Sequence, residues 1–254
     1  MSKKQIRYYN SFTDDFVESK NQDYELPKDY KWIRTDFLSR FLSGLIYSLA
    51  LVFSSFYCRL LLHVRFKNSK VLKQTKKTGA FIYANHTQIV GDVFNPALCC
   101  FPNRIYTVVS TANYGIPVIG KILYYLGALP ITKTLDGMKK LSNAMECRLE
   151  KNRCIVIYPE AHVWEYFTDI RPFADTSFKF PVKFSKPVFC MTTTYQKQRF
   201  FKKPKAIIYI DGPFYPDTSL SLKEQAATLR NTVYECMKKR SLNSNCEYIE
   251  YKKR

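Results

Sequence analysis

Short apolar runs alternate with amphipathic helical patterns along most of this chain, and that alternation restricts what it can fold into. Five runs read as strands: 80–84, 105–109, 154–158, 187–193 and 205–210. Two helical faces follow the three-to-four residue spacing of a helix, and they consist of Leu135, Met138, Leu141, Met145 and Leu149, and of Ala226, Leu229, Val233 and Met237. Ser221 and Glu224 form a capping box that opens the second helix. The pattern predicts an α/β fold: a single domain with a central, mostly parallel mixed sheet flanked by helices.

An uncharged segment between Arg40 and Arg59 predicts an N-terminal helix that associates with a membrane. It contains eighteen residues, and four Ser and one Gly weaken its apolar character. Eighteen helical residues span about 27 Å, close to the ~30 Å thickness of the hydrocarbon layer. A full span and a helix that lies in one leaflet or in the interface both remain open. A buried core helix is the third alternative, but no comparably apolar helix is available to cover it.

The charge balance indicates an anionic partner. Forty Lys and Arg oppose 21 Asp and Glu, giving a net charge of +19. Nucleic acid, anionic lipid headgroups and an acidic carrier or cofactor all fit this excess. The 19 Tyr and 19 Phe suit a membrane interface and also a groove for single-stranded nucleic acid. The eight cysteines form no CxxC pair and, with three histidines, no zinc spacing, so we expect free thiols in a reducing compartment. The first 35 residues are too polar for a signal peptide. Residues 248–254 read as a basic tail.

Polar side chains of the types that enzymes use in catalysis and binding follow several of the expected strands. Asn85 and His86 come directly after 80–84, and Asp92 lies six residues beyond His86. Lys133 ends the run that begins at Gly127, and Glu160 follows 154–158. Ligands of open α/β sheets bind beyond the carboxyl ends of the strands, so these groups are expected to converge. Histidine titrates near neutrality, and a carboxylate beside it can orient the ring, which makes such a pair suited to general-base chemistry.

These motifs resemble those of the glycerolipid (lysophospholipid) acyltransferase family, whose best-known members are the 1-acylglycerol-3-phosphate acyltransferases. The resemblance covers roughly residues 67–215. The first family motif is Asn-His, four residues and Asp; here five residues separate His86 from Asp92. The second corresponds to Pro117–Gly120 and Gly127–Lys133, with Lys133 in the place of an arginine.

The third and fourth motifs diverge further. Phe-Pro-Glu-Gly-Thr-Arg of the family corresponds to Tyr158-Pro159-Glu160-Ala161-His162-Val163, which keeps only Pro and Glu. The fourth would fall near 186–191, with Cys190 in the place of a central proline. We expect Arg171 to supply the guanidinium that Val163 lacks.

The resemblance implies a membrane-associated acyltransferase on the cytoplasmic face. It would move a fatty acyl group from acyl-CoA or acyl-carrier protein, as cosubstrate, to a hydroxyl of lysophosphatidic acid or a related lysolipid. His86 would be the general base and Asp92 its partner, with no metal, no cofactor and no covalent intermediate. Lys133, Glu160, His162 and Arg171 would bind substrate. The chain would then comprise a polar lead-in (1–36), a membrane-associating helical segment (37–66) and an acyltransferase domain (67–254), with membrane lipids and an anionic bilayer surface as partners.

Two alternatives remain at this stage. An inactive membrane-bound relative that binds lipid would explain the missing motif residues. A basic nucleic-acid-binding protein would explain the charge and the aromatic content, but it leaves the apolar segment and the grouping of His86, Asp92 and Glu160 unexplained.

Overall fold

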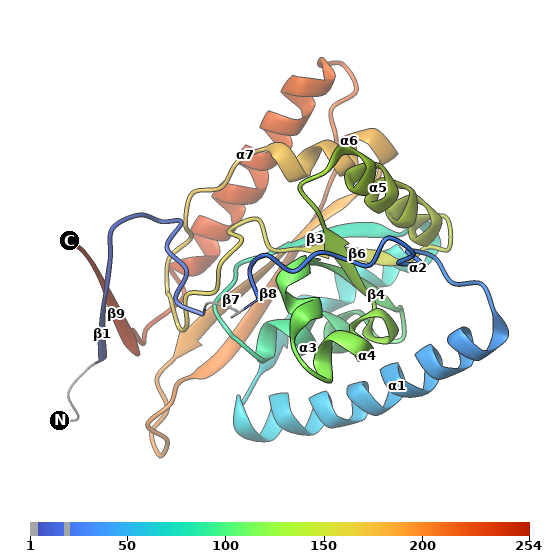
Figure 1. The fold of residues 1–254 in the computed structure, drawn as a ribbon. Helices are drawn as coiled ribbons and strands as arrows, with labels where there is room; N and C mark the ends of the chain where they lie inside the picture. Colours follow the sequence, from blue (N-terminus) through green and yellow to red (C-terminus); the bar gives the residue numbers. More distant parts are fainter. Residues whose placement is uncertain (1–4, 18–20) are drawn as a thin grey trace.

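The fold is the α/β arrangement expected from the alternation of strands and helices (Figure 1). It comes from a computed structural model that describes residues 5–17 and 21–254; residues 1–4 and 18–20 of the expected lead-in lie outside the described residues. Within those ranges, seven strands form one sheet in the order β2-β8-β7-β3-β6-β4-β5. All its neighbouring pairs are parallel except β7–β8.

The strands are β1 (Gln5–Tyr9), β2 (Arg65–Lys67), β3 (Ala80–Ala84), β4 (Ile105–Ser110), β5 (Ala128–Ile131), β6 (Cys154–Ile157), β7 (Val188–Gln196), β8 (Lys205–Phe214) and β9 (Ile249–Lys253). The α-helices are α1 (Phe37–Phe56), α2 (Thr75–Thr78), α3 (Gly91–Cys100), α4 (Ile119–Leu126), α5 (Leu135–Leu149), α6 (Lys179–Phe184) and α7 (Leu222–Ser241). A π-helical turn, η1 (Tyr57–Leu61), continues α1, and short 3₁₀ turns occupy Ser69–Gln74, Thr111–Gly115 and Thr176–Phe178. The five expected strands and both expected helices are present, and Ser221 and Glu224 make the reciprocal capping contacts.

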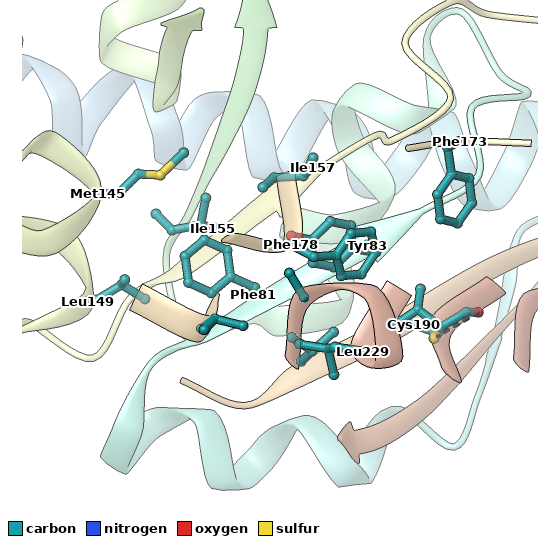
Figure 2. Packing of buried hydrophobic residues seen from close by; sticks show 14 of the residues in the cluster. Phe81, Tyr83, Met145, Leu149, Ile155, Ile157, Phe173, Phe178, Cys190 and Leu229 are labelled. Atoms are coloured by element: carbon teal, nitrogen blue, oxygen red, sulfur yellow. Dashed lines mark hydrogen bonds between the residues drawn. The ribbon is translucent and has the colours of Figure 1, made fainter. Parts of the chain in front are cut away.

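The central strand β3 is buried on both faces, which explains its uninterrupted apolar sequence. Phe81 and Tyr83 point to the side covered by α5 and α7, and Ala80, Ile82 and Ala84 point to the side of α3. The Tyr83 ring stacks on Phe178 with ring centroids 4.0 Å apart (Figure 2). Because its neighbours on either side, β6 and β7, run parallel to it, the loops that follow β3 and β6 emerge at one edge of the sheet.

The two ends of the chain correct one sequence-based expectation. Residues 248–254, interpreted as a basic tail, contain β9, which pairs in parallel with β1 from Gln5↔Ile249 to Tyr9↔Lys253. The basic residues in β9 concealed its strand character. The lead-in is therefore packed on the domain: the Trp164 ring, which is fully buried, lies 4.8 Å from the ring of Tyr9 and 4.9 Å from that of Tyr251.

Helix α1 turns Ser43 and Tyr47 toward the protein and most of its large apolar side chains outward. Ser43 donates a hydrogen bond to the Tyr125 carbonyl (3.0 Å) and accepts one from Arg104 (2.6 Å), and the Ile105 amide donates to the Tyr47 hydroxyl (3.3 Å). The exposed side chains are Phe37, Leu38, Phe41, Leu45, Leu49, Val52, Phe53 and Phe56, followed by Leu60 and Leu61 of η1. This is the reverse of a helix in a water-soluble domain. It excludes the buried core helix that the sequence left open.

Among the described residues, Phe37–Leu61 is the one helix long and apolar enough to cross a membrane, judged by length and composition. In Figure 1 it lies along the lower side of the domain, beneath α3 and α4.

Leu141→Ala should destabilise the domain by roughly 2–5 kcal/mol, because it removes a fully buried side chain from the cluster around β3 and α5. Leu135→Ala, in the same helix but with a side chain 91% exposed, should change stability by less than about 0.5 kcal/mol. Chemical denaturation of both variants measures the difference. Equal effects would show that the packing around α5 is not as described.

Candidate active site

His86 and Asp92 form a hydrogen-bonded pair at the carboxyl end of β3. Nδ1 of His86 lies 2.8 Å from Oδ2 of Asp92. An ionised carboxylate only accepts hydrogen bonds, so Nδ1 carries the proton and Nε2 keeps a lone pair. Asp92 is 3% exposed and the His86 side chain 20%. The pair thus combines a sequestered carboxylate with an imidazole that a substrate can reach.

The carboxylate of Asp92 is fixed by more than the histidine. The same oxygen accepts hydrogen bonds from the backbone amides of Thr87 (2.8 Å) and Gln88 (2.9 Å). Because the first residues of the loop all bond to Asp92, the loop curls around this carboxylate. Five residues therefore fit between His86 and Asp92. The loop therefore holds the carboxylate of Asp92 in a fixed position beside the imidazole.

Strand β7 holds the start of this loop through its backbone and through Tyr195. The side-chain Nδ2 of Asn85 donates to the Thr193 carbonyl (3.1 Å), and its Oδ1 accepts from the Thr193 backbone N–H (2.8 Å). The Asn85 side chain thus extends the ladder between β3 and β7 by one step. The Tyr195 hydroxyl donates to Thr87, 2.8 Å from its hydroxyl and 3.0 Å from its carbonyl oxygen. The loop that carries His86 is therefore anchored to a buried strand. Sequence reasoning did not assign a role to Tyr195.

Tyr158 donates a hydrogen bond to a carbonyl group of α3 that Pro96 leaves without its usual helical partner. Pro96, inside α3, has no N–H to donate to the carbonyl of Asp92 four residues earlier. The Tyr158 hydroxyl donates to that carbonyl instead, at 2.5 Å. Burial, and then the charge of Asp92, raise the pKa of Tyr158 well above its usual range, so the hydroxyl stays protonated. The Tyr158 ring also stacks on His86, with centroids 4.3 Å apart. Helix α3 begins at Gly91, so the proline lies beyond its first turn.

Glu160 connects the loop after β6 to the histidine. One carboxylate oxygen accepts from the backbone amide of His86 (2.9 Å) and from the Arg171 guanidinium (3.1 Å), and the other accepts from the Arg171 backbone amide (2.9 Å). The Trp164 amide donates to the His86 carbonyl (3.0 Å), so both backbone polar groups of His86 bond to residues 160–164.

Arg171 is enclosed rather than presented to solvent. Its side chain is 1% exposed and lies over the Trp164 ring, 4.9 Å from the centroid. The guanidinium also donates to the carbonyl groups of His162 and Phe12. Burial lowers the pKa of Arg171, and the charge of Glu160 opposes that effect. Glu160 and Arg171 form an ion pair, and their burial does not support the expectation that either one touches a substrate directly.

Ala161 stands at the glycine position of the third family motif. Its φ is 64°, in the left-handed region that glycine adopts readily and other residues disfavour. A glycine at this position would therefore fit the turn without strain.

Lys133 and His162, the two other expected substrate-binding residues, are more accessible. Lys133 is exposed and lines a cavity of about 510 Å³ between residues 22–32 and the start of α5. It follows β5, and three strand spacings of ~4.8 Å put that strand about 14 Å from β3. The His162 ring nitrogen Nδ1 lies 3.1 Å from the Asp15 carboxylate. Within the described part of the chain, no group of three or more His, Cys, Asp and Glu could hold a metal ion.

Comparisons with known proteins agree with the fold. The model of the family described as Acyltransferase matches residues 63–194. The crystal structure of the 1-acyl-sn-glycerophosphate (LPA) acyltransferase PlsC from Thermotoga maritima is similar, with a TM-score of 0.53 and 15% identity over 85% of this chain and 87% of that one. No curated protein matches the sequence.

Glu160→Gln should destabilise the protein about as much as Glu160→Ala, by roughly 3–5 kcal/mol, because it leaves a buried guanidinium unpaired. Both carboxylate oxygens face only donors, so the amide nitrogen of glutamine would meet an N–H in either orientation. The control is Glu165→Gln, whose partly exposed pair with Arg7 should contribute less than about 1 kcal/mol. Denaturation curves that rank Glu165→Gln as the more harmful change would contradict this description of Glu160.

Proposed function

The chain belongs to the acyltransferase family, and we propose that it moves a fatty acyl group from an acyl thioester to a hydroxyl of lysophosphatidic acid or a related lysolipid. The observation that carries the proposal is the His86–Asp92 pair, in which Nε2 of a reachable imidazole is free to accept a proton. The thioester would be acyl-CoA or acyl-carrier protein, since the net charge of +19 suits either anionic donor.

The reaction would proceed by direct attack. Nε2 of His86 takes the proton of the acceptor hydroxyl while its oxygen attacks the thioester carbonyl carbon. Asp92 holds the ring and stabilises the imidazolium. The tetrahedral intermediate collapses, the C–S bond breaks, and the leaving thiolate recovers the proton from His86. Backbone amides or Lys133 would stabilise the oxyanion.

The remaining polar residues divide into two roles. Glu160 and Arg171 are positioning residues that do not meet the substrate. Glu160 fixes the backbone of His86, and Arg171 pairs with Glu160. Lys133 and His162 are accessible and would contact the headgroup of the acceptor or the phosphates of the donor. Lysine supplies charge without the planar fork of arginine, so the headgroup contact at Lys133 would be a single ionic one.

We also propose that α1 lies in the membrane interface. Its polar stripe is bonded to the domain through Ser43 and Tyr47, so a span across the bilayer would have to give up these contacts. Its apolar side chains are free to enter one leaflet. The exposed apolar surface continues to the catalytic loop through Ile89, Val90 and Val93. Lysolipid would thus reach His86 without leaving the bilayer.

His86→Ala should lower the transfer rate by about 10²–10⁴-fold, the usual contribution of a general base. Asp92→Asn should come close to that loss because a neutral amide cannot stabilise the imidazolium. The measurement is the rate of labelled acyl transfer in lipid vesicles, with thermal unfolding to show that each variant is folded. His162→Ala is the comparison, and a His86→Ala enzyme that keeps more than about a tenth of the rate would shift the assignment to His162.

Leu49→Glu combined with Val52→Glu should weaken vesicle binding by at least about tenfold, because carboxylates on the apolar face would have to enter the bilayer. The control is Leu222→Glu at the start of α7, another exposed leucine. Co-sedimentation at low and high salt separates the apolar part of binding from the electrostatic part, which salt screens. Equal binding by both variants would contradict the placement of α1.

A further inference from the structure

The turn between β7 and β8 exposes two adjacent phenylalanines among basic residues. Phe200 is 84% exposed and Phe201 is 56% exposed. Arg199, Lys202 and Lys203 beside them are also exposed. Single exposed apolar residues are ordinary on protein surfaces. A pair at the tip of a hairpin, flanked by three cations, is a more specific arrangement.

The turn is joined to the end of the apolar helix. The Phe201 ring lies 4.6 Å from the ring of His63, and the Ala206 amide donates to the Leu62 carbonyl at 3.5 Å. Leu60 and Leu61, directly before, are exposed. In Figure 1 the β7–β8 hairpin extends below the sheet to the same side of the molecule as α1.

The cations of the turn are available to an anion outside the protein. The Arg199 guanidinium lies over the Phe200 ring, 5.4 Å from its centroid. None of the ion pairs among residues 5–17 and 21–254 involves Arg199, Lys202 or Lys203. The side-chain amide of Gln198 donates a hydrogen bond from Nε2 to the Lys203 carbonyl (3.0 Å) and closes the turn.

We propose that residues 197–204 are a second membrane contact, which places Phe200 and Phe201 among the headgroups of an anionic bilayer. Aromatic rings favour this depth, and each basic residue near an anionic surface contributes ~1 kcal/mol. Two contacts, α1 and the turn, would stop the domain from rolling about the helix axis. The orientation of the catalytic loop toward the lipid would then be fixed. The inference rests on the proposed membrane placement of α1 but concerns separate residues.

Tryptophan fluorescence of full-length Phe200→Trp tests this contact. The protein is bound to phosphatidylcholine–phosphatidylglycerol vesicles with brominated acyl chains, which quench only nearby rings. The signal of the parent protein, from Trp32 and Trp164, is subtracted. The control is Leu222→Trp, at an exposed position at the start of α7. We expect at least about twofold stronger quenching at position 200 than at position 222, because only the former would meet the bilayer.

A second arm tests the charge. Arg199→Glu, Lys202→Glu and Lys203→Glu, added to Phe200→Trp, should reduce the quenching at position 200 by at least about half, because cations attracted to the surface become repelled anions. Unchanged quenching would overturn the electrostatic part. Protein that co-sediments with vesicles while position 200 behaves like position 222 would overturn the second contact and leave α1 intact. Protein that does not co-sediment would overturn both. Quenching lost only when RNA or another protein is added would assign the turn to that partner instead.

Discussion

The buried carboxylate of Glu160 is the constraint on which the site depends. A charge removed from water must be matched by donors, and here the donors are the His86 amide and two groups of Arg171. Satisfying that carboxylate locks the loop after β3 to the loop after β6. His86 is thereby held through its backbone, which leaves its ring free to pair with Asp92.

The sequence predicted those features that depend on local pattern. The periodicity of the apolar residues located the strands and helices. The short separation of His86 and Asp92 in the sequence predicted that they lie close together. Contacts made by distant segments could not be predicted. Nothing near Arg171 indicates that Trp164 and Phe12 enclose it, because Phe12 reaches it only through the folding of the lead-in. The pairing of β1 with β9 was missed for the same reason, and the charged residues at the end of β9 resembled a basic tail.

Helix α1 has one side with polar groups bonded to the domain and another side with exposed apolar side chains. Its Ser43 and Tyr47 side chains satisfy polar groups of the domain, and most of its Phe and Leu side chains are exposed. The ring of Phe53 meets that of Phe94 in α3, 5.8 Å between centroids, so the helix bearing Asp92 rests on this apolar surface. The His86–Asp92 pair, proposed to be catalytic, is thus connected through α3 to the proposed lipid-facing surface. An apolar acyl chain would not have to cross water to reach His86.

The most direct test of direct acyl transfer is the release of free coenzyme A from a long-chain acyl-CoA, followed chromatographically in anionic vesicles as lysophosphatidic acid is varied. Direct attack by the acceptor hydroxyl, with His86 as base, predicts that release requires the acceptor, saturates with it and matches the ester formed mole for mole. A stoichiometric burst of coenzyme A without acceptor would contradict the account, because it would reveal an acyl-enzyme intermediate.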